Sequence, residues 1–141
     1  MIKIKRFDKN IPLPEYKTVG AAGLDMIARE TVEIPARSLG YVPLNVAIEP
    51  PVGYFMMLVA RSSTHKKGLW MANGIGIMDP DYSGNEDEYK AVYYNFTDAP
   101  VKVEKGERIA QVVCVKMETP VIQEVDTMPN KTRGGFGTTG K

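Results

Sequence analysis

Short apolar segments separated by turn residues are the feature that most constrains how this chain can fold. Segments rich in Val, Ile and Tyr recur along the sequence, and ten prolines and thirteen glycines punctuate it, as in Glu49-Pro50-Pro51. Helical periodicity is nearly absent, and short apolar runs between turn residues are typical of β-strands. Many short strands in one compact unit predict an all-β fold of the sandwich, barrel or jelly-roll type.

The same pattern places the individual elements. Strands are expected over residues 2–7, 24–28, 31–34, 39–47, 53–60, 75–78, 89–95, 101–103 and 109–117. A helix of one or two turns is expected over residues 62–68. Serines begin that segment, basic residues fill its last turn and a glycine ends it, which are ordinary helix start and stop signals.

The chain has the length of a single domain whose last part leaves the core. Its 141 residues fit one substantial hydrophobic core. Strong apolar alternation is lost from about Thr119 onward, so we expect residues 1–125 to form the β core and residues 126–141 a flexible C-terminal arm. An arm with little surface to bury either stays free or docks on a neighbouring subunit or a ligand.

Charge and composition exclude several classes of protein. The net charge of +1 gives no general reason to expect nucleic acid or a membrane surface as a partner. No apolar stretch approaches the length of a bilayer span and no signal peptide is expected, so a cytoplasmic location is predicted. The single cysteine, Cys114, fits a reducing compartment, and one cysteine with one histidine disfavours structural zinc. Any metal is expected to be a hard cation held by oxygens.

The glycine-rich end of the chain carries the parts of a nucleotide site. Residues 133–141 contain Arg133, Phe136, Thr138 and Thr139 among four glycines. Arginine offers a planar fork of donors to phosphate oxygens, successive backbone N–H groups can form an anion-binding nest, and a phenyl ring can stack on a base. The alternative is a disordered, glycine-rich terminus.

A second group of residues suits an anion. Arg61-Ser62-Ser63 opens the expected helix, where unpaired N–H groups favour negative charge. An ordinary N-cap serine beside a solvated arginine is the alternative. Gln111 is a polar residue in the strongest expected strand, and if it faces inward it needs a partner, for which a ligand phosphate is one option.

The segment from Asn73 to Gly84 suits proton transfer and base recognition. Asn73-Gly74 predicts a turn, and the apolar residues after it predict one side of a hairpin. Asp79 then lies at a strand end, where a carboxylate can act as general base towards a water, while Tyr82 can wall a pocket. The alternative is an Asx-type turn for Asp79 and Asp81, with Tyr82 in the core.

Several other residues have more ordinary interpretations. His65 is expected to face solvent on the short helix, and Cys114 to be inert core. Trp70 is expected in the core or at a subunit interface. The acidic run Glu86-Asp87-Glu88 is interpreted as the solvated tip of a hairpin.

Five segments, in this order, resemble the five motifs of the homotrimeric dUTP pyrophosphatases (dUTPases). They are Ala22-Gly23-Leu24-Asp25, Arg61-Ser62-Ser63, Gly76-Ile77-Met78-Asp79-Pro80-Asp81-Tyr82-Ser83-Gly84, Arg108-Ile109-Ala110-Gln111 and Arg133-Gly134-Gly135-Phe136-Gly137-Thr138-Thr139-Gly140. The resemblance covers almost the whole chain. The segment of residues 85–94 is longer than the corresponding segment in most members and resembles a variant found among some Gram-positive bacterial and phage dUTPases.

The resemblance implies a fold, an activity and an assembly. The fold is a jelly-roll-like β subunit with an extended C-terminal arm, assembled as a homotrimer with active sites at subunit interfaces. The activity is Mg²⁺-dependent hydrolysis of dUTP to dUMP and pyrophosphate by attack of water on the α-phosphate, which limits uracil incorporation into DNA and supplies dUMP for dTMP synthesis.

The resemblance also implies a role for each matching residue. Asp79 would orient and deprotonate the attacking water, and Tyr82 would pack against the deoxyribose and exclude a 2′-hydroxyl. Asp25 would support the metal indirectly at most, because Mg²⁺ is expected to bind mainly to substrate phosphates and water, or would support subunit contacts. The other substrate-binding positions implied are Asn73, Gly76 and Met78 for uracil; Arg61, Ser62, Ser63 and Gln111 for phosphates; and Phe136 for stacking on uracil, with Arg133, Gly137, Thr138 and Thr139 closing over the phosphates.

Two other functions fit the same fold. A dCTP deaminase also carries an arginine–serine motif, but it uses a glutamate as acid and base, whereas this chain has Asp79 and a Phe-containing tail. A non-catalytic nucleotide sensor or protein-binding module is the second alternative, and the sequence leaves room for a regulatory protein partner.

Overall fold

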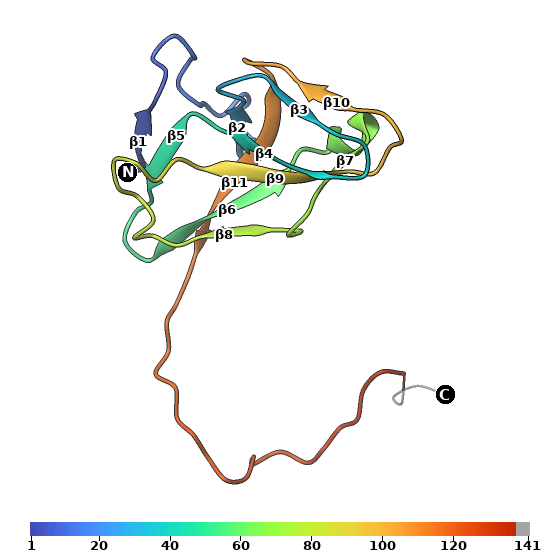
Figure 1. Cartoon of the computed structure of the whole chain (residues 1–141). Helices are drawn as coiled ribbons and strands as arrows, with labels where there is room; N and C mark the ends of the chain where they lie inside the picture. The colour runs from blue at the N-terminus through green and yellow to red at the C-terminus, as the bar shows by residue number, and fades with distance from the viewer. Residues whose placement is uncertain (138–141) are drawn as a thin grey trace.

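Eleven β-strands and one 3₁₀ turn make up the computed structural model, which describes residues 1–137 (Figure 1). The strands are β1 (Lys3–Arg6), β2 (Leu24–Ile27), β3 (Val32–Ile34), β4 (Leu39–Pro43), β5 (Val46–Glu49), β6 (Tyr54–Ala60), β7 (Leu69–Met71), β8 (Gly76–Met78), β9 (Lys90–Asn95), β10 (Val101–Val103) and β11 (Arg108–Lys116). The 3₁₀ turn η1 covers Thr64–Lys67. The all-β prediction with one short helix is confirmed.

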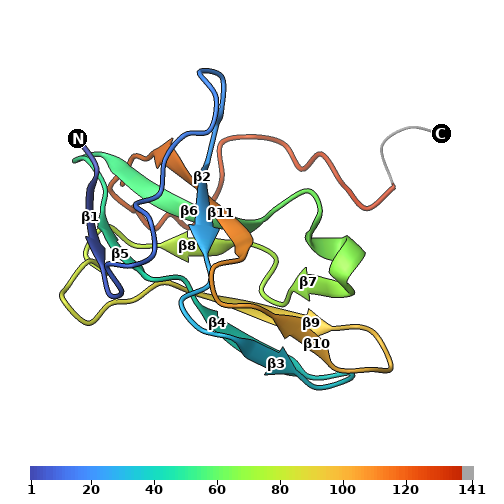
Figure 2. The same ribbon diagram turned by 90° about the horizontal axis from the view of Figure 1, so that it is seen from above.

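The strands pair antiparallel in four sheets. The largest sheet has the order β2-β11-β6-β8, a three-stranded sheet has the order β4-β9-β7, and β1-β5 and β10-β3 are two-stranded. Figure 2 shows β3, β4, β9 and β10 together on one side of the molecule and β2, β6, β8 and β11 on the other. This is the expected jelly-roll-like architecture, with the core between the sheets.

Alternation along the strands builds that core. In β9, Ala91, Tyr93 and Asn95 are buried, and the residues between them are half-buried, because successive side chains of a strand point to opposite faces. Burying a large apolar side chain contributes about 1.5–3 kcal/mol. Among the described residues, no buried side-chain nitrogen or oxygen lacks a hydrogen-bond partner.

A β-bulge interrupts the pairing of β11 with β2. The register shifts between Arg108 and Ala110, and the consecutive residues Ile109 and Ala110 are both buried. An extra residue in one strand takes local backbone groups out of the ladder. The carbonyls of Arg108 and Ile109 accept hydrogen bonds from the side chains of Arg61 and Tyr93 instead, so the bulge ties β11 to two other parts of the fold.

The prediction of one strand over residues 39–47 is wrong. The chain forms β4 beside β9, turns near Asn45, and continues as β5 beside β1. Asn45 has a φ of 68°, a left-handed conformation that asparagine tolerates better than branched residues do. Strand β7 was not predicted, because three residues directly after a helical turn are too few to show an alternating pattern.

After β11 the chain leaves the core as an extended arm (Figure 1). The backbone N–H of Met117 still donates to the carbonyl of Gly53 at 2.9 Å. Residues 118–137 form no strand or helix, and all of them are exposed except the half-buried Gly135. No helix within residues 1–137 is long and apolar enough to cross a bilayer.

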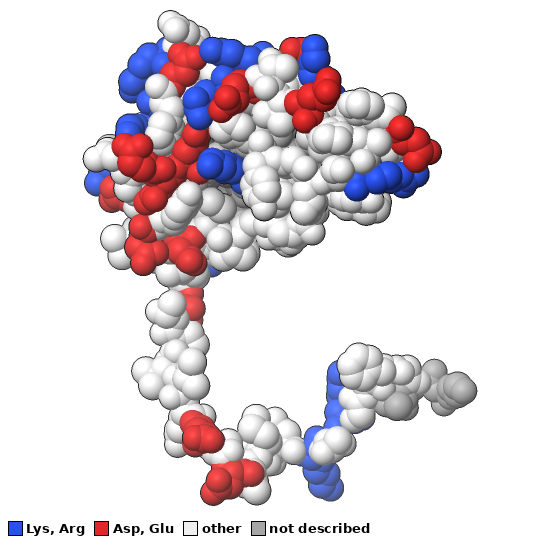
Figure 3. Space-filling view, viewed as in Figure 1, with Lys and Arg blue, Asp and Glu red and all other residues white. Residues whose placement is uncertain are grey.

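Charged side chains of both signs are interspersed over the core surface (Figure 3). Uncharged surface lies over the β4-β9-β7 sheet in the same view. Exposed apolar side chains on these strands include Leu39 at 55%, Tyr41 at 63% and Trp70 at 53%, and the Trp70 ring stacks on those of Tyr94 and Phe96. Clustered exposed apolar residues are typical of an interaction surface.

Candidate active site

An ion-paired cluster joins the residues of three of the five motifs. Asp25 on β2 accepts from Arg61 Nε through Oδ1 at 2.9 Å and from Arg108 Nη1 through Oδ2 at 3.2 Å. The Asp25 side chain is only 18% exposed, against 32% for Arg61 and 49% for Arg108. The carboxylate therefore holds two guanidinium groups at one edge of the sheet, with their remaining donors available to an anion.

Backbone carbonyls of the bulge in β11 hold this cluster in place through hydrogen bonds. Arg61 Nη1 donates to the Arg108 carbonyl at 3.1 Å, and Tyr93 Oη donates to the Ile109 carbonyl at 2.6 Å. Thr64 of η1 also donates to Ile109 at 3.5 Å and accepts from the Arg61 backbone N–H at 3.1 Å. Burial raises the pKa of Tyr93 above its ordinary range, so its phenol stays a donor.

Ser62 and Ser63 lie exposed beside Arg61 at the start of η1. Ser63 occupies the N-cap position but makes no side-chain capping bond. The expected helix is a single 3₁₀ turn of four residues, so the N-terminal dipole invoked from the sequence is weaker than expected, because that dipole grows with aligned peptide units. Attraction for an anion here comes mainly from the arginines and the free hydroxyls.

Gln111 has a protein partner. Its Nε2 donates to the Ala60 carbonyl at 3.1 Å, and its Oε1 lies where a Cβ on Gly23 would come within 3.1 Å. A side chain larger than hydrogen at position 23 would crowd the glutamine. The glycine of the first motif and the glutamine of the fourth are thus neighbours.

The segment from Asn73 to Met78 forms the expected turn but not the expected hairpin. The Gly74 N–H donates to the Met71 carbonyl at 3.0 Å, and Gly74 has a φ of 70°. The strands on either side then enter different sheets: β7 pairs with β9, whereas β8 pairs with β6. Gly76 is buried, and a Cβ there would come within 3.1 Å of the Leu58 Cβ, so β8 lies close against β6.

Asp79 follows β8 with its carboxylate exposed. Within residues 1–137 this carboxylate makes no hydrogen bond or ion pair. The Asp79 carbonyl accepts from the Tyr82 N–H at 3.0 Å, which closes the turn through the backbone. The Asx-type turn at Asp79 is therefore excluded, and the acceptor oxygens of Asp79 are available to a water or a ligand.

Tyr82 is 40% exposed, so it is not a core residue. Its ring stacks on Tyr89 with a centroid separation of 6.2 Å and an interplanar angle of 18°, and its hydroxyl donates to the Glu88 carbonyl at 3.3 Å. The interpretation of Glu86-Asp87-Glu88 as a solvated tip is wrong for its last residue. Glu88 is 7% exposed and ion-paired to Arg29, a partner too far along the chain for the sequence to suggest.

The arm keeps its residues away from both core groups (Figure 1). Arg133 is exposed, with no hydrogen bond or ion pair in the described part of the chain, and Phe136 is fully exposed. Positive φ angles at Gly134 (81°), Phe136 (51°) and Gly137 (85°) give this segment a curled backbone. Thr138 and Thr139 lie outside the described residues.

The two core groups are also apart within one chain. Met78 pairs with Met56 on β6, so Asp79 lies level with Phe55, whereas Arg61 follows the other end of that strand. Six residues of strand correspond to roughly 20 Å. One chain thus presents an arginine–carboxylate cluster, a separate Asp79–Tyr82 turn and an arm that extends away from both.

His65 is exposed, as expected, and Cys114 is only half-buried, with a pKa that burial raises.

Comparison with known proteins places the chain in a family. The dUTPase family model matches residues 9–140. Deoxyuridine 5′-triphosphate nucleotidohydrolase of Dictyoglomus turgidum is 34% identical over 99% of this chain and 97% of its own length. The enzyme of that name from Thermobifida fusca is 36% identical over 99% of this chain and 78% of its own length.

Solved structures agree. The dUTPase of Streptococcus mutans matches with a TM-score of 0.76 and 33% identity over 84% of this chain and 98% of that one. The dUTPase of Staphylococcus bacteriophage 80alpha, solved with dUpNHpp, matches with a TM-score of 0.86 and 26% identity over 99% and 98%. These similarities confirm the resemblance drawn from the five motifs, and the chain belongs to the dUTPase family.

Proposed function

We propose that this protein hydrolyses dUTP to dUMP and pyrophosphate, which limits uracil incorporation into DNA and supplies dUMP for dTMP synthesis. The observation that carries the proposal is Asp79, an exposed carboxylate directly after β8 that has no hydrogen-bond or ion-pair partner within residues 1–137 and lies in the range matched by the dUTPase family model. A carboxylate without a protein partner can hold and deprotonate a water.

The reaction needs one water and one proton acceptor. The water oxygen forms a bond to the α-phosphorus, and the bond from that phosphorus to the oxygen bridging the α- and β-phosphates breaks. Asp79 takes the proton of the water, and pyrophosphate leaves with the bridging oxygen. Because little covalent chemistry falls to the protein, catalysis rests on positioning and on neutralising charge.

Phosphate binding falls to the cluster around Asp25. Arg61, Ser62 and Ser63 present a guanidinium group and two free hydroxyls on one exposed turn, fixed by the bulge in β11. The Gln111 amide donates to Ala60 and leaves its second N–H for a phosphate oxygen. Asp25 orients Arg61 before the substrate arrives, which lowers the entropy lost on binding.

The family uses a divalent metal, and we propose that it is Mg²⁺. Residues 1–137 contain no group of three or more His, Cys, Asp or Glu that could hold a metal ion, and Asp25 is engaged by two arginines. This donor set fits Mg²⁺, which keeps several waters and binds largely through substrate phosphates. Bound there, the metal supplies charge neutralisation, and Asp25 contributes through its hydrogen-bonded neighbours.

Recognition of the nucleoside falls to the turn and strand before Asp79. Asn73 lies exposed at a tight turn, and β8 carries backbone donors and acceptors at Gly76 and Met78 for the edge of uracil. A mismatched base would leave one of these groups buried and unpaired, which is costly. Tyr82 packs against the deoxyribose and leaves no room for a 2′-hydroxyl.

A complete site requires more than one copy of the chain. Asp79 and Arg61 lie roughly 20 Å apart along the sheet of one chain, and Phe136 and Arg133 lie on an arm directed away from both (Figure 1). A homotrimer brings these groups together from different subunits. The exposed apolar residues Leu39, Tyr41 and Trp70 supply surface for such contacts.

The test is release of pyrophosphate from a panel of nucleotides in the presence of Mg²⁺. Purified protein should release it from dUTP far faster than from dCTP, dTTP or UTP. Deamination of dCTP would contradict the proposal, as would nucleotide binding without turnover.

A further inference from the structure

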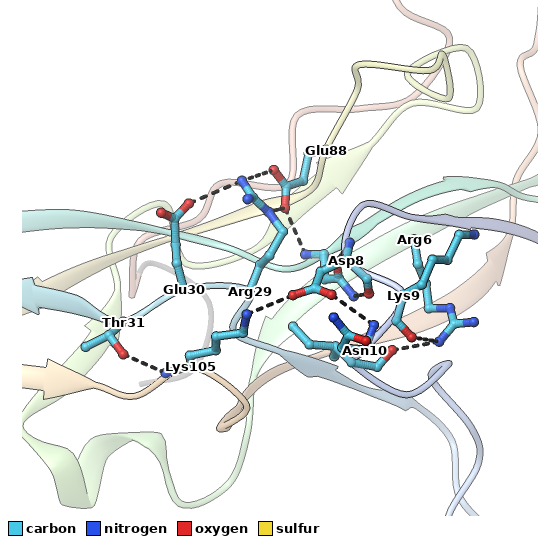
Figure 4. A network of polar contacts seen from close by, with 11 residues as sticks. Arg6, Asp8, Lys9, Asn10, Arg29, Glu30, Thr31, Glu88 and Lys105 are labelled. Atoms are coloured by element: carbon cyan, nitrogen blue, oxygen red, sulfur yellow. Dashed lines mark hydrogen bonds and ion pairs between the residues drawn. The ribbon is translucent and has the colours of Figure 1, made fainter.

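Arg29 and Glu88 form an ion pair next to Tyr82, and neither residue belongs to any of the five motifs. Arg29 Nε donates to Glu88 Oε1 at 2.7 Å, and Arg29 Nη2 donates to Oε2 at 2.9 Å. The backbone N–H of Asn45 also donates to Oε1, at 3.0 Å. The Glu88 side chain is 8% exposed. Figure 4 shows Glu88 facing Arg29 across this network.

The bidentate ion pair between Arg29 and Glu88 fixes the position of Glu88. A buried carboxylate is tolerated only with paired charge and satisfied lone pairs, and a bidentate guanidinium fixes direction as well as distance. Asn45 is itself held, because its side chain accepts from the Asp8 N–H at 2.6 Å and donates to the Asp8 carbonyl at 3.1 Å. Lys105 in turn pairs with Asp8 at 2.8 Å (Figure 4). Glu88 is therefore held from two directions.

Both supports of the Tyr82 side chain come from Glu88 and the residue after it. The Tyr82 hydroxyl donates to the carbonyl of Glu88, and the Tyr82 ring stacks on Tyr89. Tyr89 is fully buried, and its N–H donates to the Val46 carbonyl at 2.8 Å. Because Tyr82 itself is 40% exposed, its orientation depends on where Glu88 and Tyr89 are held.

The longer loop before Glu88 does not provide that support. Gly84 N–H donates to Asp87 Oδ2 at 2.7 Å, and Asp87 N–H donates back to the Gly84 carbonyl at 3.3 Å, so this turn closes on itself. Within residues 1–137, its one side-chain contact with another strand is that of Lys5 Nζ with the Asn85 carbonyl. The first residue after Tyr82 that is both buried and charged is Glu88.

We propose that Arg29 and Glu88 are positioning residues that hold Tyr82 against the sugar and thereby set the selectivity for dUTP over UTP. The inference rests on the proposed function, in which Tyr82 excludes the 2′-hydroxyl. A hydroxyl is small, so a small displacement of the ring would admit it. A pair that fixes the carbonyl under the Tyr82 hydroxyl controls that displacement.

The experiment measures kcat/KM for dUTP and for UTP in Glu88→Gln and in Tyr82→Phe. Glu88→Gln keeps the size of the side chain and removes its charge. Tyr82→Phe removes only the hydroxyl that reaches Glu88, at an exposed position where folding is not at risk. Each should lower the ratio of the two kcat/KM values about 10-fold, mainly through faster UTP cleavage. The double variant should fall no further than the larger single effect, because both act on one contact.

A matched control is Asp98→Asn, which removes the charge from an exposed ion pair with Arg37 at 2.8 Å and should leave the ratio unchanged. An unchanged ratio in folded Glu88→Gln would overturn the proposal. If that variant does not fold, an unchanged ratio in Tyr82→Phe would overturn it equally. Failure of the unmodified protein to cleave dUTP would instead contradict the proposed function, so the two failures are distinguishable.

Discussion

The expected site residues of the β core and those of the C-terminal arm differ in how firmly the protein orients them before a ligand binds. In the core, Arg61 is ion-paired to Asp25 and bonded to a bulge carbonyl, and Tyr82 rests on a buried tyrosine. In the arm, Phe136 is fully exposed, and residues 118–137 form no strand or helix. Core residues are thus oriented before any ligand arrives, whereas arm residues must be ordered by binding. Chemistry should depend on the first group and closure on the second.

The largest expected effect is that of Asp79→Asn. Loss of the general base should lower kcat by about 10²–10⁴-fold, while affinity for a non-hydrolysable dUTP analogue stays largely in place, because the phosphate and base contacts are elsewhere. Single-turnover rates and equilibrium binding would separate the two quantities. A variant that turns over at a near-normal rate would show that Asp79 is not the base.

Truncation after Lys131 should have the next largest effect. Removing Arg133 and Phe136 should lower kcat/KM at least about 100-fold, because an open site leaves the substrate poorly positioned and wet. The melting temperature should change little, since residues 132–137 lie outside every strand and all but Gly135 are exposed. An active truncated protein would refute the role of the arm.

Mixing variants sharpens that test. Truncated protein supplies intact Asp79, and Asp79→Asn protein supplies an intact arm. If sites are shared between subunits, unfolding and refolding the two together should restore part of the activity that each lacks alone. The absence of any recovery in verified mixed oligomers would mean that Asp79 and the arm of one site come from the same chain.

Phe136→Ala, also in the arm, should lower kcat/KM less than the truncation does. Stacking of a base on an aromatic ring contributes about 1–3 kcal/mol, so kcat/KM should fall roughly 5- to 150-fold. Phe136→Trp, which keeps a stacking face, is the matched control and should retain most of the activity. Equal losses in both variants would argue against stacking.

The smallest expected effect concerns the core alone. Burial raises the pKa of both Tyr89 and Tyr93 above the ordinary value of 10.0. The unfolded chain loses these protons near pH 10 while the folded chain retains them, so the free energy of unfolding should be undiminished below about pH 10 and fall above it. Denaturant titrations from about pH 8 to about pH 11 would measure the slope. Tyr93→Phe should reduce that slope, and an identical slope would contradict the assignment.

Local patterns in the sequence predict most strands and the contents of the site. The alternation that places Ala91 and Tyr93 in the core is visible in the sequence, as is the turn at Asn73-Gly74. The motifs also predict which side chains carry the chemistry, because each motif is short and contiguous. These are features that residues within a few positions of one another determine.

What the sequence could not predict depends on partners far along the chain. The break between β4 and β5 reflects competition between β9 and β1 as pairing partners. The turn after Met71 leads into a different sheet because β6 pairs with β8. Glu88 looks like a solvated acid beside Glu86 and Asp87, and its burial depends on Arg29, 59 residues away, and on the backbone N–H of Asn45.

The exposed backbone beyond Met117 has a practical consequence for anyone handling this protein. Extended, solvent-exposed segments are where proteases cut first, and residues 118–134 form such a segment next to a folded core. A single cut there would leave every strand intact. The shortened protein would pass spectroscopic and thermal tests of quality and still fail in an assay, so intact mass should be checked before any loss of activity is assigned to a substitution.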